Sequence, residues 1–131
     1  VADSDWYLQV HSTSPLLRPE TIAAGLAALE SSPEHDSLFS VPRLQTRLYD
    51  ANSQPVNHDP SVLLRTQDLP PLYEENSGMY VFSREQIAEG RRFGDRPLLF
   101  EINPLEATDI DEEPDFLLAD TLHRMQREGL L

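Results

Sequence analysis

Two aspartates separated by one residue, Asp109 and Asp111, form the arrangement in this sequence most directly suited to chemistry. If the segment is extended, the two carboxylates face one way and Ile110 faces the core. Two aligned carboxylates supply oxygen ligands of the kind that Mg²⁺ prefers, and Mg²⁺ keeps several waters besides them. The alternative is that Asp111 caps a following helix, whose first turn is acidic. The spacing alone leaves both interpretations open and slightly favours the cap.

A second polar group lies in the stretch RTQDLPPLYEENSGMY, residues 65–80. It places a guanidinium, a carboxamide and a carboxylate within four positions, at Arg65, Gln67 and Asp68. The two consecutive prolines that follow exclude a helix, because each lacks an N–H and fixes φ. We therefore expect the polar side chains on an extended or turning backbone, a usual setting for binding residues. A surface turn with solvated side chains is an equal alternative.

Further residue types fit the binding of an anion or a sugar. Arginine pairs bidentately with carboxylate or phosphate, although a single surface arginine more often forms an ordinary ion pair. Aromatic side chains can wall a sugar pocket or belong to the core. No His/Glu pair at helical spacing indicates zinc, and the GxSxG, P-loop and GxGxxG motifs do not occur. The candidates are the arginines Arg47, Arg65, Arg91 and Arg92, the aromatic residues Tyr80 and Phe93, and the histidines His11 and His58.

Composition limits the classes of function. The 131 residues are enough for a single domain with one core, spanning residues 1–131. The chain has no cysteine, which excludes disulfides and thiolate metal sites. A net charge of −13, with ten arginines and no lysine, argues against nucleic acid and anionic membranes as partners. No apolar run reaches the roughly 18 residues of a membrane span, and the N-terminus has no basic region typical of a signal peptide.

The elements that would position these residues follow from hydrophobic periodicity. Residues 6–10 and 36–41 predict strands, and residues 19–30 between them predict an amphipathic helix that begins at a proline. This succession predicts a βαβ unit with a parallel sheet and a right-handed crossover. Residues 11–19 then form a loop at the C-terminal end of the first strand, where ligands collect in open α/β sheets.

The second half of the chain continues the alternation. Residues 43–49, 78–82 and 97–102 predict strands. A capping box over residues 83–86 predicts a short helix that ends at Gly90. A last helix is expected from about residue 112 to 128, with its inward side formed by Leu118, Leu122 and Met125.

Four segments, in this order and spacing, resemble the cytidylyltransferases that activate acidic 2-keto sugars, the CMP-sialic acid synthetases and their relatives. They are QVHSTSPLL at residues 9–17, DSLFSV at 36–41, the stretch at 65–80, and DIDEEPDFLLAD at 109–120. The third and fourth are specific together, whereas TSPL alone is weak. The resemblance covers nearly the whole chain and matches only the middle and C-terminal part of such an enzyme.

The resemblance implies an α/β fold of the nucleotide-diphospho-sugar transferase type. Its sheet is mostly parallel and Rossmann-like with flanking helices, its N-terminal portion is missing here, and a small β-rich extension serves dimerisation and sugar binding. The implied reaction joins CTP and an acidic 2-keto sugar such as N-acetylneuraminate into CMP-sugar and pyrophosphate, assisted by Mg²⁺. A cytoplasmic homodimer is implied as well.

The resemblance also suggests roles for individual residues. Asp109 and Asp111 match the family's metal-binding pair, which makes them the catalytic candidates and is compatible with a helix cap. His11 stands where the family commonly has glutamine, so it is a substrate-binding candidate without a defined role. The other substrate-binding candidates are Arg65 and Gln67, which match an R-x-Q near the sugar, Tyr80, which matches a pocket aromatic, Arg92 and Phe93 in the same pocket, and Arg47, which replaces a lysine used for the sugar carboxylate.

The missing N-terminal portion matters for activity. In the family it carries a basic, glycine-containing loop that grips the CTP triphosphate, and nothing in these 131 residues replaces it. We therefore expect the chain alone to be inactive or very weak, with the activity belonging to a longer protein. The alternative is a non-catalytic module for dimerisation and interaction, left by truncation of such an enzyme.

Overall fold

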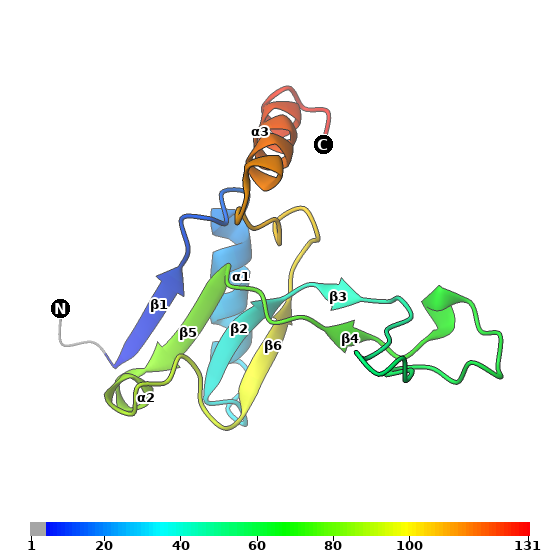
Figure 1. Cartoon of the computed structure of the whole chain (residues 1–131). Helices are drawn as coiled ribbons and strands as arrows, with labels where there is room; N and C mark the ends of the chain where they lie inside the picture. The colour runs from blue at the N-terminus through cyan, green and yellow to red at the C-terminus, as the bar shows by residue number, and fades with distance from the viewer. Residues whose placement is uncertain (1–4) are drawn as a thin grey trace.

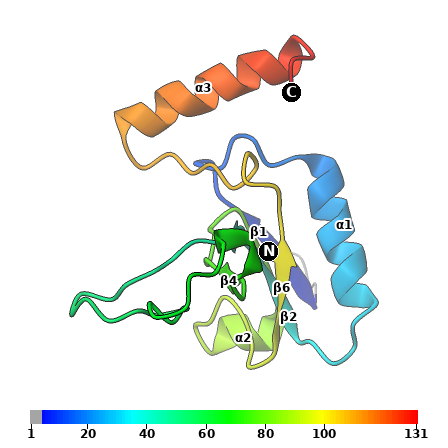
Figure 2. The ribbon, with the colours of Figure 1, turned by 90° about the vertical axis from the view of Figure 1, so that its right-hand side faces the viewer.

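A computed structural model describes residues 5–131 as a four-stranded sheet with a helix on one face and an arm at one side (Figure 1). Residues 1–4, which belong to the N-terminal stretch considered above, lie outside the described part. Helix α1 (Pro19–Glu30) covers one face of the sheet, and helix α3 (Glu113–Arg127) stands beyond its upper edge (Figure 2). Within the described residues no helix is long and apolar enough to cross a bilayer.

The sheet has the strand order β1-β5-β2-β6 and is mixed. Its strands are β1 (Trp6–Val10), β5 (Met79–Ser83), β2 (Ser37–Val41) and β6 (Pro97–Glu101). β5 is antiparallel to both β1 and β2, while β2 and β6 are parallel. The predicted β1-α1-β2 crossover is present with both strands running the same way, but β5 lies between them.

The expectation of a mostly parallel sheet is therefore wrong for this chain. Two of the three strand pairings are antiparallel, and only β2 and β6 form the parallel neighbours expected of a Rossmann-like sheet. The physical reason is that side chains alternate with a period of two in either direction. A buried apolar run such as residues 79–82 thus shows that a strand exists without showing its direction.

The core has one layer on each face of the sheet. On the helix side, Leu38, Met79 and Val81 pack with residues of α1 and β6. Gly25 lets α1 approach closely, since an added Cβ would lie 2.6 Å from the Met79 methyl carbon. On the other face, a second cluster is formed by Phe39, Val41, Tyr80 and Phe82, with Tyr7 and Phe93 packed against it.

The arm leaves the sheet between β2 and β5. Its base is a two-stranded ribbon in which β3 (Arg43–Leu44) pairs with β4 (Leu72–Tyr73), and it contains the short 3-10 helix Thr66–Asp68. A strand was predicted over residues 43–49, but the observed strand β3 ends at Leu44, where the chain turns. Beyond it, Tyr49 forms one isolated bridge, to Pro55. Both views show the arm projecting away from the sheet.

The two helices in the second half begin close to the predicted positions, but only one of the predicted caps is found. Helix α2 (Arg84–Ala88) begins with the predicted capping box of Ser83 and Gln86. The N-cap of α3 is Glu112, so Asp111 is not the cap that one interpretation proposed. On α3 it is Ala119 that is buried, whereas Leu118 is 53% exposed and does not belong to the inward side as expected. The helix stands off the sheet, so its large apolar residues Phe116, Leu117 and Leu118 are not buried against the core of the described residues.

Candidate functional site

The nine predicted site residues fall into three groups in space. One group lies on the sheet face opposite α1, one on the arm, and one on the loop that follows β6. The first contains His11, Tyr80, Arg92 and Phe93, the second Arg47, Arg65 and Gln67, and the third Asp109 and Asp111.

The sheet-face group is centred on Tyr80 of β5. The centroids of the His11 and Phe39 rings each lie 6.2 Å from the Tyr80 centroid, and the Arg92 guanidinium carbon lies 4.8 Å above the Tyr80 ring. Phe93 joins through Phe39, with their centroids 5.1 Å apart. We call these five residues the Tyr80 cluster. Tyr80 itself is only 1% exposed, so it serves as a floor beneath Arg92 rather than as an open wall.

Polar contacts fix the cluster at its edges. The Tyr80 hydroxyl donates to Glu75 Oε1 at 2.7 Å. Burial raises the pKa of Tyr80, and the hydrogen bond to Glu75 raises it further, so the phenol remains a protonated donor. At the other side, Gln9 Nε2 lies 2.8 Å from His11 Nε2. The Gln9 amide thereby holds the imidazole beside the Tyr80 ring.

Sequence reasoning missed Gln9, Phe39 and Glu75 as members of this site. The register explains the first two, because Gln9, Tyr80 and Phe39 are direct neighbours across β1, β5 and β2. Residues opposite one another on adjacent strands bring their side chains into contact. The only sequence signal was the alternation itself, and it becomes useful only when the strand order is known.

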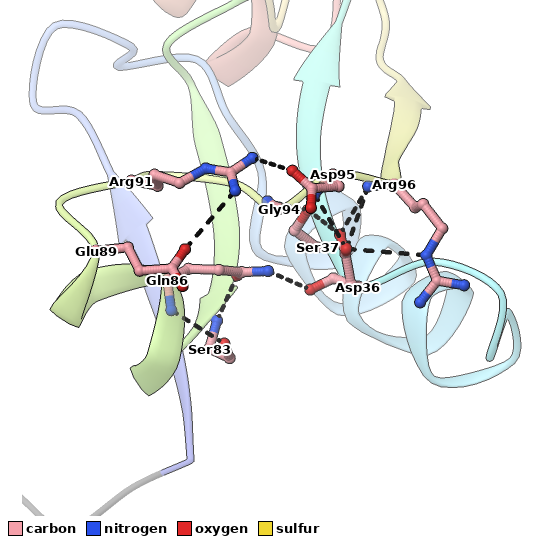
Figure 3. Close-up of polar contacts among 9 residues, drawn as sticks. All are labelled: Asp36, Ser37, Ser83, Gln86, Glu89, Arg91, Gly94, Asp95 and Arg96. Atoms are coloured by element: carbon pink, nitrogen blue, oxygen red, sulfur yellow. Dashed lines mark hydrogen bonds and ion pairs between the residues drawn. The ribbon is translucent and has the colours of Figure 1, made fainter.

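The loop over residues 91–96, which carries Arg92 and Phe93, is held by a polar network around Asp36 (Figure 3). The Asp36 carboxylate accepts hydrogen bonds from the backbone N–H of Asp95 and of Arg96, each at 3.1 Å. Ser37 Oγ accepts from the Gly94 N–H at 2.8 Å. Burial of Asp36 acts to raise its pKa, but the hydrogen bonds from Ser37, Arg96 and Asp95 outweigh it, so the pKa is lowered.

Gly94 and Gln86 complete this network. An added Cβ at Gly94 would lie 2.3 Å from Asp36 Oδ1 and 2.3 Å from Gln86 Nε2, which no side chain tolerates without a shift. Gln86 Nε2 donates to the Asp36 carbonyl at 3.0 Å, and Arg91 pairs with Asp95 at 2.7 Å. The network therefore anchors both ends of the loop, and Arg92 and Phe93 project from the part between them.

The loop after β6 places Asp109 and Asp111 next to the loop after β1. The Ile110 N–H donates to the Thr13 carbonyl at 2.9 Å, two residues beyond His11. The segment is irregular rather than extended strand, and Ile110 is only partly buried, so the strand-like geometry expected for the pair is not found. Neither aspartate forms an ion pair with the described residues, although Asp109 Oδ1 accepts a hydrogen bond from the Ile110 N–H at 3.1 Å.

Two buried polar residues hold this loop in place. Asn76, 8% exposed, donates from Nδ2 to the Ala107 carbonyl at 3.0 Å and accepts at Oδ1 from the Gly78 N–H at 2.9 Å. Its own N–H donates to the Ser40 carbonyl at 3.0 Å. Asn76 thus joins the loop before Asp109 to β2 and to the start of β5, immediately beside Glu75.

Glu106, 2% exposed, ties the same loop to the start of α1. Its carboxylate accepts from the Arg18 guanidinium at 2.8 and 3.0 Å and from the Arg18 backbone N–H at 3.1 Å. Burial acts to raise the pKa of Glu106, but hydrogen bonds from Thr21 and Arg18 outweigh it and lower the pKa. The charged form is therefore the one that fits this site.

The donor set of the third group suits a hard cation. Among residues 5–131 no cluster of three His, Cys, Asp or Glu side chains is placed to hold a metal ion. Asp109 and Asp111 would supply only two carboxylates. Protein-bound Mg²⁺ is commonly held by one or two carboxylates, with waters and the phosphates of the substrate as its other ligands. Two carboxylates are hard oxygen donors of the kind that Mg²⁺ prefers, whereas zinc sites use three or four protein ligands, most often Cys or His.

The predicted site residues on the arm form hydrogen bonds and an ion pair with other residues of the arm. Arg65 pairs bidentately with Asp68, with Nε and Nη2 at 2.8 and 3.1 Å from the two carboxylate oxygens. The Arg47 guanidinium donates to the Leu64 carbonyl. Gln45 Nε2 donates to the Gln67 carbonyl at 2.7 Å. Because the arm projects away from the sheet, this chain does not itself bring these side chains to the Tyr80 cluster (Figure 2).

Comparisons with known proteins identify a matching family, a related sequence and a structure of similar fold. Residues 1–124 match the family model described as cytidylyltransferase. N-acylneuraminate cytidylyltransferase A of Danio rerio is 27% identical over 123 residues, which are 88% of this chain and 28% of that protein. The crystal structure of 4-diphosphocytidyl-2C-methyl-D-erythritol synthase from Anaerococcus prevotii DSM 20548 is similar in fold, with a TM-score of 0.60 and 10% identity. The match covers 92% of this chain and 59% of the synthase, so the chain spans only part of the proteins it resembles.

Proposed function

The chain belongs to the cytidylyltransferase family, and from this premise we propose that it forms the sugar-binding and metal-binding part of an enzyme that activates an acidic 2-keto sugar. N-acetylneuraminate is the model substrate, CTP the co-substrate, and CMP-sugar and pyrophosphate the products. The observation that carries the proposal is the gathering of three predicted sugar-site residues, His11, Arg92 and Phe93, around a fourth, Tyr80, beside the loop that holds the two aspartates.

In the proposed reaction the anomeric hydroxyl oxygen of the sugar forms a bond to the α-phosphorus of CTP. The bond from that phosphorus to the bridging oxygen breaks, pyrophosphate leaves, and the hydroxyl proton passes to solvent. Catalysis is then mainly positioning and charge neutralisation. Asp109 and Asp111 would hold Mg²⁺, which when bound offsets negative charge on the phosphates.

The residues of the Tyr80 cluster would orient the sugar. Arg92 and Phe93 are presented by a loop that is anchored at both ends, and Tyr80 supports Arg92 from below. Because the loop is already fixed, these side chains can hold the sugar hydroxyl in line with the α-phosphorus at a small entropic cost. Arg65 and Gln67 would reach a sugar only in an assembly, so we propose a homodimer in which the arm of one subunit extends to the sugar site of the other.

The full activity would require more chain than the 131 residues here. The match to the Danio rerio relative covers 28% of its length, and we propose that the triphosphate-binding part lies in the remainder. Incubating this chain and the full-length gene product with CTP, Mg²⁺ and N-acetylneuraminate tests this directly. Pyrophosphate release by the full-length product and little by the chain alone is expected. Equal release by both would overturn the division of roles.

A cytoplasmic location is part of the same proposal, because CTP is a cytoplasmic metabolite. Fractionation of cells that express the full-length gene product would test it. Recovery of the protein with the soluble cytoplasmic fraction is the expected result, and recovery in a secreted fraction would contradict it.

A second candidate function is a non-catalytic interaction module. It is favoured by the outer edge of β1, which pairs with no strand of the described residues, and by Leu8 and Val10, which are 44% and 49% exposed. Unpaired apolar edges promote association. Light scattering with and without Mg²⁺ and sugar separates the two candidates. Dimers that form regardless of ligand, together with no sugar binding, would support the module.

A further inference from the structure

Many arginines in this strongly acidic chain are neutralised by a carboxylate. With 23 acidic and ten basic residues, the acidic side chains outnumber the arginines by more than two to one. Within residues 5–131, the arginines that form no ion pair are Arg43, Arg47, Arg92 and Arg127. Of these, Arg92 alone belongs to the Tyr80 cluster.

The position of Arg92 is defined by an aromatic ring rather than by an acid. Its guanidinium carbon lies 4.8 Å from the centroid of Tyr80, which is the geometry of a cation–π contact. Tyr80 is 1% exposed and therefore cannot move aside easily, whereas Arg92 is exposed. A guanidinium stacked in this way keeps its N–H edge free for a planar acceptor such as a carboxylate.

The loop that carries Arg92 is fixed before any ligand binds. Gly94, Asp95 and Arg96 give their backbone N–H groups to Ser37 and Asp36, so the residues that follow Arg92 and Phe93 are anchored to the start of β2 (Figure 3). Preorganisation of this kind reduces the entropic cost of binding. Arg92 is thus a positioned cation that pairs with no carboxylate of the described residues.

The other two arginines predicted for the sugar site, Arg65 and Arg47, already bind acceptors within this chain. Arg65 is paired bidentately with Asp68, and Arg47 donates to the Leu64 carbonyl. To bind an anionic ligand, Arg65 would first have to give up a charge-assisted pair. Both residues lie on the arm, between β3 and β4, and in the proposed dimer they would reach only the sugar site of the other subunit.

We propose that Arg92 binds the carboxylate of the acidic substrate and so determines the preference of this site for acidic over neutral sugars. The inference rests on the proposed function and deepens it by naming the residue that recognises the acid. The carboxylate would lie against the N–H edge of the guanidinium, with Tyr80 as the floor of the site.

Glu75 is the charged group that faces the same ring from its hydroxyl end. It accepts the Tyr80 O–H at 2.7 Å and forms no ion pair with Arg92. Its negative charge opposes a second carboxylate nearby, while its hydrogen bond holds Tyr80 under Arg92. Glu75→Gln keeps the acceptor and removes the charge, so it should strengthen binding of the acidic sugar by a few-fold.

The test uses the full-length gene product with two probes, N-acetylneuraminate and its methyl ester, in which the carboxylate is masked. Calorimetry gives the dissociation constants, and turnover with CTP gives kcat and KM. Arg92→Gln should weaken binding of the acid about tenfold or more and leave the ester unchanged. Arg92→Lys should fall between, because it keeps the charge and loses the flat stacked fork. Arg127→Gln is the matched control, with the same charge change on the exposed end of α3, and should behave like the wild type.

The outcomes separate the inference from the proposed function. A wild type that neither binds nor converts N-acetylneuraminate overturns both. A wild type that converts the sugar, with Arg92→Gln equal to Arg127→Gln, overturns the role of Arg92 alone. Retained ester binding by Arg92→Gln shows that the variant is folded. If that variant does not fold, Arg92→Lys decides, since an unchanged ratio of acid to ester affinity in it would also refute the inference.

Discussion

Replacing Asp36 by asparagine is the change that should most clearly reveal how the Tyr80 cluster is held. Asparagine keeps the size of the side chain but turns one oxygen into an NH₂ donor. In the structure the two Asp36 oxygens accept from Ser37 Oγ at 2.9 Å, from the Asp95 N–H at 3.1 Å, and from the Arg96 N–H at 3.1 and 3.2 Å. In Asp36→Asn the new NH₂ group would face N–H groups that are themselves donors.

The expected cost follows from the number and kind of these bonds. A hydrogen bond to a charged group contributes about 1.5–3 kcal/mol, and at least one is lost while the others weaken. Because Asp36 keeps some exposure, with 28% of its side chain accessible, we expect the free energy of unfolding to fall by about 2–3 kcal/mol. For a chain of this size that corresponds to a melting temperature lower by about 6–12 °C.

The pH dependence provides a sharper test of the cause. The pKa of Asp36 is lowered below its ordinary value of 3.8 in the folded chain. The stabilisation is therefore present above the unfolded pKa and is lost as the pH falls through the folded pKa. A protonated Asp36 resembles an asparagine, so the difference between wild type and Asp36→Asn should be full at pH 7 and should shrink below about pH 4.

Urea unfolding followed by circular dichroism at pH 7 and at pH 3 measures both effects. Asp120→Asn is the control, since Asp120 makes an exposed pair with Arg124 one helical turn away, worth about 0.3–0.5 kcal/mol. Equal unfolding midpoints for Asp36→Asn and the control at pH 7 would refute the role of the network. A difference that persists undiminished at pH 3 would refute the charge-based explanation.

Three further changes test other parts of the account. Gly94→Ala should lower the free energy of unfolding by about 1–3 kcal/mol, because its Cβ would lie 2.3 Å from Asp36 Oδ1; thermal melts check this, and an unchanged melting temperature would show that the loop adapts. Asn76→Ala leaves the Ala107 carbonyl and the Gly78 N–H without their partner, and it should lower the free energy of unfolding, measured by chemical denaturation, by about 2–4 kcal/mol. A decrease below about 1 kcal/mol would count against a structural role for Asn76. Asp109→Asn and Asp111→Asn should leave the melting temperature nearly unchanged and raise the Mg²⁺ concentration for half-maximal pyrophosphate release by the full-length gene product about tenfold or more; an unaltered Mg²⁺ titration would remove both residues from the metal site.

The local elements could be predicted because their signals are local. The helix that begins at Pro19, the capping box of Ser83 and Gln86, and the strands at residues 6–10 and 97–101 all rest on residues close in sequence. The position of β5 between β1 and β2 could not be predicted, because it depends on where the arm returns to the sheet. The same long-range dependence explains why α3 exposes Leu118, since nothing among the described residues covers that side.

The site was predicted in part, and the reasons differ from residue to residue. Tyr80 and His11 were selected by residue type and by family resemblance, and the structure brings them together with Arg92 and Phe93. Their roles in binding stay predictions. Glu75 stood within the polar stretch without a distinguishing signal, and only the fold shows that its carboxylate accepts the Tyr80 hydroxyl. Register and loop anchoring are properties of the folded chain, so no pattern of residue types could supply them.

The central claim is that this chain belongs to an enzyme that joins CTP to an acidic 2-keto sugar. ³¹P NMR of the full-length gene product with CTP, Mg²⁺ and N-acetylneuraminate tests it most directly, because a CMP-sugar phosphodiester and pyrophosphate give separate signals. The account predicts that both signals grow together with the acidic sugar and are absent with the neutral sugar N-acetylmannosamine. Unchanged CTP with the acidic sugar, or equal conversion of the neutral one, would contradict it.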